Sequence, residues 1–242
     1  MTLPWDAALR RLPAVPVDAR LLPFFRSVFE FQREAAGRLD PADTGSLLPL
    51  LPAFASAVAP PGPAAEAIRV LAADPAGMRS LMDTYVAEGP SDFPPLLGLQ
   101  ARTFLQPLMH LRFASLPATA NPKPGLCPRC GHPPLVGALR QSGDSDERSM
   151  TCSLCLSEWM VPRIACLSCG ETDEKKLPRY TAQQIPHVHA EACDSCKGYI
   201  KVIDLTIDGD AVPIADDLAS LSLDVVARQR GYSKKVANLA GI

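Results

Sequence analysis

Eight cysteines are the residues of this chain best suited to chemistry, and all of them lie between positions 127 and 196. They form four C-x-x-C pairs: Cys127/Cys130, Cys152/Cys155, Cys166/Cys169 and Cys193/Cys196. A C-x-x-C loop turns two thiolates toward a common centre, and two such loops complete a tetrahedral shell of four sulfurs around one metal ion. Four pairs therefore predict two metal sites.

The spacing of the pairs predicts which of them share an ion. Gaps of 21 and 23 residues separate the first pair from the second and the third from the fourth, whereas 10 residues separate the second from the third. Each long gap has room for a β-hairpin, so we expect an internal repeat of two zinc-ribbon or rubredoxin-like modules. The expected sets are Cys127, Cys130, Cys152 and Cys155 for the first site and Cys166, Cys169, Cys193 and Cys196 for the second. Gly131 and Gly170 follow equivalent cysteines, which supports this pairing.

A site with four protein ligands has no open position for a substrate or a water molecule, so Lewis-acid catalysis at the metal is not expected. Zinc and iron both accept four thiolates, and the spacing does not choose between them. A purely structural role is favoured over a redox role, because a structural zinc ion contributes on the order of 10–16 kcal/mol of apparent folding free energy to such small modules. Thioredoxin-type dithiol chemistry is disfavoured, because four regular pairs are too many and no βαβ context surrounds them.

Composition narrows the class of protein further. The 242 residues carry a net charge of −2, which argues against a general nucleic-acid binder. No apolar run reaches 18 residues, so no membrane span is expected. The N-terminus lacks the layout of a signal peptide, which predicts a cytoplasmic protein. In that reducing compartment eight cysteines favour metal binding over disulfides.

Prolines interrupt the apolar first half of the chain. Because proline ends or kinks a helix, this half is predicted to form short helices that end at prolines. His110 is the one histidine of this half, and without a partner acid or nucleophile it is expected to be structural. The helices are expected at 5–12, 21–39, 47–58 (as one short helix or two turns), 64–73, 76–87 and 96–114. Pro107 is expected to kink or divide the last of them.

The second half of the chain is predicted to form β-strands between and after the cysteine pairs. The expected strands are 134–140 and 147–151 across a turn at 141–146, then 159–164, then 177–182 and 185–192, and finally a strand after Cys196. Pro186 predicts an edge position. His187, His189 and Glu191 share one strand face, which we expect to face solvent; a partner surface or an auxiliary ligand set is the alternative. A single helix over 216–229 and a frayed tail are expected to follow.

These features predict an α+β fold in which a helical N-terminal domain precedes two tandem rubredoxin-like or zinc-ribbon modules and a C-terminal helix. The expected helical domain spans 1–116 and the linker 117–126. The first module spans 127–164, and the second, with the C-terminal helix, spans 165–242. Because only 10 residues join the modules, they are expected to pack as one unit.

The short sequence motifs around the cysteines resemble those of one protein family. They are CPRCGHPP at 127–134, CSLCLSEW at 152–159, CLSCG at 166–170, EACDSCKGYIK at 191–201 and ADDLASLSLD at 215–224. In this order they resemble the formate dehydrogenase accessory proteins, the FdhE-like family. The resemblance covers about the last half of the chain.

This resemblance implies a cytoplasmic accessory factor rather than an enzyme. Family members are needed to obtain active respiratory formate dehydrogenase, and they are thought to bind its catalytic subunit before export. They carry two rubredoxin-like iron sites, so the eight cysteines would be iron ligands here, with zinc as a substitute after overexpression. A rubredoxin-like electron carrier or redox sensor acting on that enzyme is the alternative function. A zinc-ribbon nucleic-acid module is a third function, disfavoured by the acidic balance.

Overall fold

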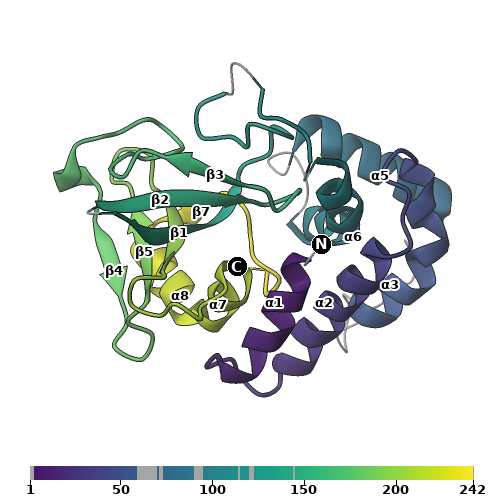
Figure 1. Cartoon of the computed structure of the whole chain (residues 1–242), viewed down its shortest axis with the longest axis horizontal. Helices are drawn as coiled ribbons and strands as arrows, with labels where there is room; N and C mark the ends of the chain where they lie inside the picture. The colour runs from purple at the N-terminus through teal and green to yellow at the C-terminus, as the bar shows by residue number, and fades with distance from the viewer. Residues whose placement is uncertain are drawn as a thin grey trace.

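The structure is a computed structural model that describes residues 3–58, 70, 73–89, 95–113, 115–119, 123–143 and 145–241. A lobe of helices lies beside a lobe built around a sheet, and the first helix lies between them with the C-terminal segment (Figure 1). This arrangement confirms the predicted α+β class. Among the described residues, no helix combines the length and the hydropathy that crossing a membrane requires.

The helical lobe contains most of the predicted helices. Its elements are α1 (Pro4–Arg11), η1 (Leu12–Ala14), α2 (Leu22–Ala36), η2 (Thr44–Leu50), α3 (Leu51–Val58), α5 (Pro75–Glu88) and α6 (Pro95–Phe113). The predicted segment 47–58 is divided between a 3-10 helix and an α-helix. The helix predicted at 64–73 falls almost wholly outside the described residues. The rings of Phe31 and Phe104 each pack against Phe54, with centroids 5.3 and 4.8 Å from it, and this contact joins α2, α3 and α6.

Pro107 does not divide α6, because another side chain replaces the hydrogen bond that proline cannot make. Proline has no N–H, so the carbonyl of Thr103 one turn earlier lacks its helical donor. The Nε2 atom of Gln32 donates to that carbonyl at 2.9 Å and to Oε1 of Gln106 at 2.7 Å. Gln32 is fully buried on α2, so the same contacts join α2 to α6.

The sheet lobe repeats one pattern twice: a cysteine pair, two strands, a second cysteine pair and a third strand. Its strands are β1 (Pro134–Ser142), β2 (Ser145–Cys152), β3 (Glu158–Val161), β4 (Arg179–Thr181), β5 (Val188–Ala192), β6 (Gly198–Asp204) and β7 (Ser233–Lys234). The strand order is β3-β2-β1-β6-β5-β4, and β7 pairs with the start of β6. Each module thus contributes its three strands in the same order.

The two modules form one sheet because β1 and β6 pair in parallel, with Gly137 opposite Val202. A Cβ atom at Gly137 would lie 3.0 Å from both the Met150 and the Val202 side chains. Glycine is therefore the residue that lets the seam between the modules close. The pairing agrees with the expectation that the modules pack as one unit.

Two details of the predicted hairpins are wrong. The first hairpin is longer than expected, because β1 and β2 continue to a pair between Ser142 and Ser145. In the second hairpin Pro186 lies before β5, and β5 is an interior strand between β4 and β6. The proline therefore costs no ladder hydrogen bond, and β4 forms the edge of the sheet.

The single helix expected at 216–229 is two helices, α7 (Pro213–Ala219) and α8 (Leu221–Gln229). The chain turns between them at Ser220, and the carbonyls of Asp217 and Ser220 accept from Nζ of Lys201 at 2.5 and 3.3 Å. The lysine of β6 therefore binds carbonyls that a continuous helix would use internally. The turn also changes the buried face, because Leu223 is buried whereas Val225 is 44% exposed.

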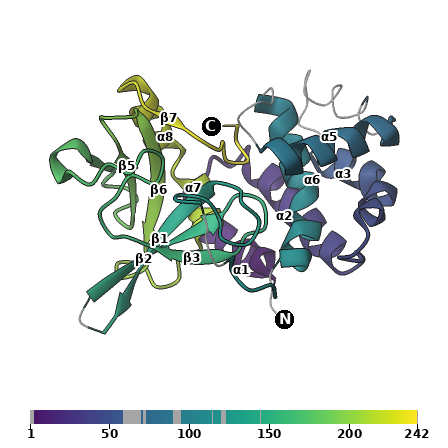
Figure 2. The same cartoon turned by 90° about the horizontal axis from the view of Figure 1, so that it is seen from above.

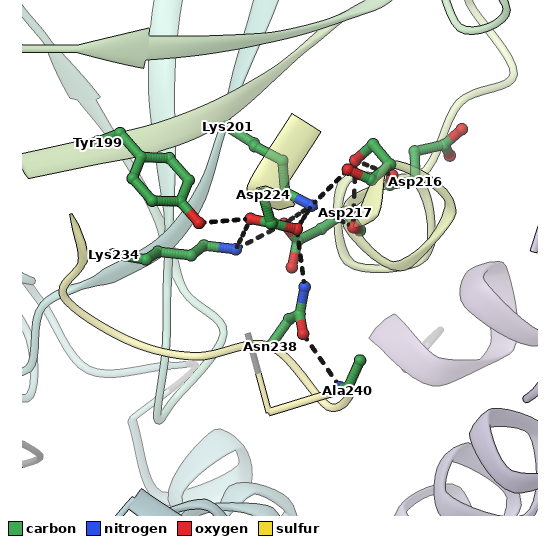
Figure 3. Close-up of polar contacts among 9 residues, drawn as sticks. Tyr199, Lys201, Asp216, Asp217, Asp224, Lys234, Asn238 and Ala240 are labelled. Carbon is green, nitrogen blue, oxygen red and sulfur yellow. Dashed lines mark hydrogen bonds and ion pairs between the residues drawn. The ribbon is translucent and has the colours of Figure 1, made fainter. Parts of the chain in front are cut away.

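The described part of the C-terminal tail packs against the sheet lobe, where fraying was expected. A buried network of charges binds it to β6 and to both C-terminal helices (Figure 3). Nζ of Lys201 lies 3.0 Å from Asp217 and 2.5 Å from Asp224, and Nζ of Lys234 lies 2.8 Å from Asp217. The amide of Asn238 donates to Asp224 at 3.4 Å. Two lysines thus neutralise two aspartates that are removed from water.

The first helix packs on the sheet lobe as well as on α2. Trp5 is fully buried in the same apolar core as Ile203 of β6 and Leu218 of α7. Nη2 of Arg11 lies 2.6 Å from Asp208 and 2.9 Å from the buried Asp216. The two lobes therefore share a core, and the predicted domain boundaries at 116, 126 and 164 stay predictions.

Replacing Lys201 with Met is expected to lower the free energy of unfolding by about 3–5 kcal/mol, because it leaves the buried Asp217 and Asp224 with only Lys234 to balance them. Chemical denaturation of the metal-loaded chain measures the change. Lys176→Met is the matched control, since its ion pair with Glu171 is exposed and contributes little. Equal shifts in the midpoints of the two variants would contradict the role of the network.

Candidate metal centres

The four C-x-x-C pairs fold into the same local loop. In three pairs the N–H of the fourth residue after the first cysteine donates to the carbonyl of that cysteine, at 2.8 to 2.9 Å. In all four, the N–H of the first cysteine donates to the carbonyl five residues later, at 2.8 to 3.0 Å. These bonds close the loop tightly, so both thiols of a pair point to the same side.

The residue after the second cysteine adopts the left-handed conformation in every loop. Gly131 and Gly170, the two glycines singled out in the sequence, have φ of 78° and 79°. Leu156 and Lys197 occupy the equivalent positions of the other two loops, with φ of 56° and 59°. Such values are uncommon for residues other than glycine. Because Leu156 and Lys197 occupy the same loop position as the two glycines, their left-handed conformation could have been predicted from the sequence.

The structure brings together the two sets of four sulfurs that the sequence groups. Within each set all four Sγ atoms lie within 4.8 Å of one another. The sulfurs of Cys127 and Cys155 are 3.7 Å apart and those of Cys130 and Cys152 3.3 Å apart. In the second set the distances are 3.6 Å for Cys166 to Cys196 and 3.7 Å for Cys169 to Cys193.

These distances fit a thiolate-bound metal ion. Metal–sulfur bonds of about 2.3 Å in a tetrahedron place neighbouring sulfurs about 3.8 Å apart. Both sets are thus compatible with one zinc or iron ion, and the binding of the metal stays a prediction. In the first set, hydrogen bonds from the neighbouring thiols hold the pKa of Cys127 far below its usual range, whereas burial raises the pKa of Cys152 well above it. A cation would favour ionisation of all four thiols.

The first site is docked onto the helical lobe by two polar side chains of α6. Nε2 of Gln106 donates to the carbonyl of Ser153 at 2.7 Å. Nδ1 of His110 lies 3.0 Å from the carbonyl of Cys155. Burial lowers the pKa of His110, so the ring is neutral and its Nδ1–H is the donor. The expectation that His110 is structural agrees with this position, because its ring is hydrogen-bonded to the cysteine loop.

His132, expected in a loop, extends the same docking surface to α5. It follows the first cysteine pair and is 4% exposed. Its ring stacks on Tyr85 with the centroids 5.6 Å apart, and its Nε2 atom lies 3.3 Å from the carbonyl of Val86. Both cysteine loops of the first site therefore contact helices.

The second site is open to solvent on one side. Cys169 and Cys196 are exposed and Cys166 is partly exposed, whereas three of the four cysteines of the first site are buried. Cys127, Cys152 and Cys155 belong to the apolar core of α2, α5 and α6, whereas no cysteine of the second site belongs to either apolar core of the described residues. The two sites consist of four cysteines each but differ in solvent exposure: the first is mostly buried and the second is partly exposed.

The expectation that His187 and His189 face solvent is wrong. His187 is 8% exposed and its Nε2 atom lies 2.9 Å from Asp216 on α7. His189 is 6% exposed and its Nε2 atom lies 3.3 Å from Glu191. His187 lies just before β5 and is covered by α7, whereas His189 lies on β5 itself. Neither histidine belongs to a group of possible metal ligands among the described residues.

The fold and the two sets of sulfurs define a protein with tandem four-cysteine modules on a helical body. Family models agree with this class: residues 126–163 match the central domain of FdhE, and residues 164–240 match its C-terminal domain. Among curated proteins, an FdhE homolog of Aquifex aeolicus is 32% identical over 67% of this chain and 57% of its own length. One of Pseudomonas aeruginosa is 40% identical over 47% of this chain and 38% of its own length.

A solved structure extends the likeness to the helical half. The crystal structure of the FdhE protein from Pseudomonas aeruginosa matches 98% of this chain and 93% of that chain, with a TM-score of 0.75 and 26% identity. The matches to the two curated relatives, by contrast, span less than two thirds of their length. These comparisons support an FdhE-like family for this chain.

The difference in exposure predicts two rates of metal release. A chelator is expected to remove the metal of the second site first, because attack can begin at the exposed Cys169 and Cys196, whereas the first site is enclosed by α5 and α6. Release of zinc from the zinc-loaded chain, followed with a colorimetric chelator, checks this. Cys169→Ser combined with Cys196→Ser should abolish the fast phase and keep the slow one. Release of both ions in one phase would contradict the prediction.

Proposed function

We propose that the chain is an accessory factor of a respiratory formate dehydrogenase and is not itself an enzyme. In this proposal it binds the catalytic subunit in the cytoplasm and supports its maturation before export. The observation that carries the proposal is the match of both cysteine modules to the domain models of FdhE. The likeness of the whole fold to an FdhE crystal structure adds support for the helical half.

The chemistry of the sites is consistent with this proposal. All four ligands of each site would come from cysteines, so a metal held there has no position for a substrate. The ions we propose are iron, bound by Cys127, Cys130, Cys152 and Cys155 and by Cys166, Cys169, Cys193 and Cys196. They would hold the modules rigid and so present a fixed surface to the partner subunit.

Co-purification tests the proposed partner. The tagged chain, expressed in its own host under conditions that induce formate dehydrogenase, is expected to retain the catalytic subunit of that enzyme. Deletion of the gene is expected to abolish formate dehydrogenase activity, and a plasmid copy should restore it. An unrelated protein with the same tag is the control. Absence of the subunit from the purified material, together with unaltered activity in the deletion strain, would reject the proposal.

An electron carrier or redox sensor is the second candidate, favoured by the exposure of the second site. Electron transfer to a partner needs a metal close to the surface, and Cys169 and Cys196 are exposed. This function requires iron and predicts reversible reduction of the bound ion. Metal analysis and redox titration of protein purified without oxygen from its own host test it. A chain that carries only zinc there would exclude electron transfer.

A further inference from the structure

A cavity of about 440 Å³ lies at the seam between the two modules. Residues of β1 and β2 line it from the first module, residues of β4, β5 and β6 from the second, and the C-terminal tail at 234–236 also contributes. The segment 163–168, which connects the modules, completes the lining beside Cys166 and Cys193. Cavities of this size hold small organic ligands in many proteins.

Three arginines of the lining converge on one carboxylate. Nη2 of Arg148, on β2, lies 2.6 Å from Glu191, and Nη2 of Arg179, on β4, lies 3.1 Å from it. Nη1 of Arg163, in the connecting segment, lies 4.0 Å from the same group. The positive charge around Glu191 therefore exceeds its single negative charge, in a chain whose overall charge is negative.

One of the three arginines is buried, whereas the side chains of Arg163 and Arg179 are 34% and 44% exposed. The side chain of Arg148 is only 2% exposed and that of Glu191 is 14% exposed. Nη1 of Arg148 donates at 3.1 Å to the carbonyls of Pro162 and Ala165, which anchors the connecting segment. Among the described residues, the buried Nε of Arg148 and Nη1 of Arg163 have no hydrogen-bond acceptor. Guanidinium groups have donors only, so these two N–H groups are left without a hydrogen-bond acceptor.

We propose that this cavity binds an organic anion whose carboxylate or phosphate group pairs with Arg163 and Arg179 beside Glu191. Guanidinium groups bind both kinds of anion through paired, charge-assisted hydrogen bonds. The rest of the lining includes Leu135, Ile164 and Leu167, which provide apolar surface for the body of the ligand. The cavity borders the second set of sulfurs, because Cys166 and Cys193 are part of its lining, but the proposed contacts with the ligand are made by arginines and not by sulfurs.

Binding of small probes to the full, metal-loaded chain tests the proposal by isothermal titration calorimetry. Phenyl phosphate and benzoate present the two anionic groups on the same apolar ring, and phenol is the neutral control. At least one of the two anions is expected to bind about tenfold or more tightly than phenol. The tighter of the two identifies the head group that the cavity prefers. Failure of both to bind at about 10 mM would overturn the proposal.

Charge variants test whether the arginines are responsible. R163Q and R179Q are each expected to weaken anion binding about tenfold, because each removes one charge-assisted contact. R38Q is the matched control, since Arg38 is an exposed arginine at the end of α2 and does not line the cavity. E191Q removes the competing negative charge and is expected to tighten binding, which keeps the test valid if an arginine variant folds poorly. Unchanged binding in E191Q, or equal binding in R163Q, R179Q and the wild type, would overturn the proposal.

Discussion

Strands β1 and β6 run side by side in parallel, and the sheet lobe depends on this contact. Each module alone has three short strands, which is a small sheet to support a buried core. The pairing at Gly137 and Val202 joins them into one sheet with a continuous apolar face for α1, α7 and α8. It also places Arg148 of the first module against Glu191 of the second. The seam between the modules is therefore both the centre of the lobe and the wall of its cavity.

Joining two copies of a module head to tail makes their surroundings unequal. The first module meets the helical lobe, where Gln106 and His110 bind the carbonyls of one of its cysteine loops. In the second module, by contrast, two of the four cysteines face solvent. The same four-sulfur chemistry is thus enclosed at one site and accessible at the other. In the proposed functions, the enclosed site would hold the lobes together and the open site would meet a partner or exchange electrons.

Much of the local structure could be predicted from the sequence because it depends on neighbours along the chain. The C-x-x-C spacing specifies a tight loop, and Gly131 and Gly170 allow the left-handed turn that closes it. Proline stops and apolar periodicity located α2, α5 and α6 to within a few residues. By contrast, the break between α7 and α8 was not predictable, because its cause is Lys201, a residue on a distant strand.

The sequence by itself determined which thiols can share an ion and where most helices lie. Through the residues that flank the cysteines, it also indicated the family that the chain resembles. Only the tertiary structure decided which charged side chains are buried. Lys201, Asp217 and Lys234 read as ordinary polar positions, yet they neutralise one another beneath the tail. His187 and His189 were likewise expected on a solvent-facing strand side and are buried. Whether a strand side chain is buried depends on which other parts of the chain cover that face of the strand. The local spacing of residues does not show which parts these are.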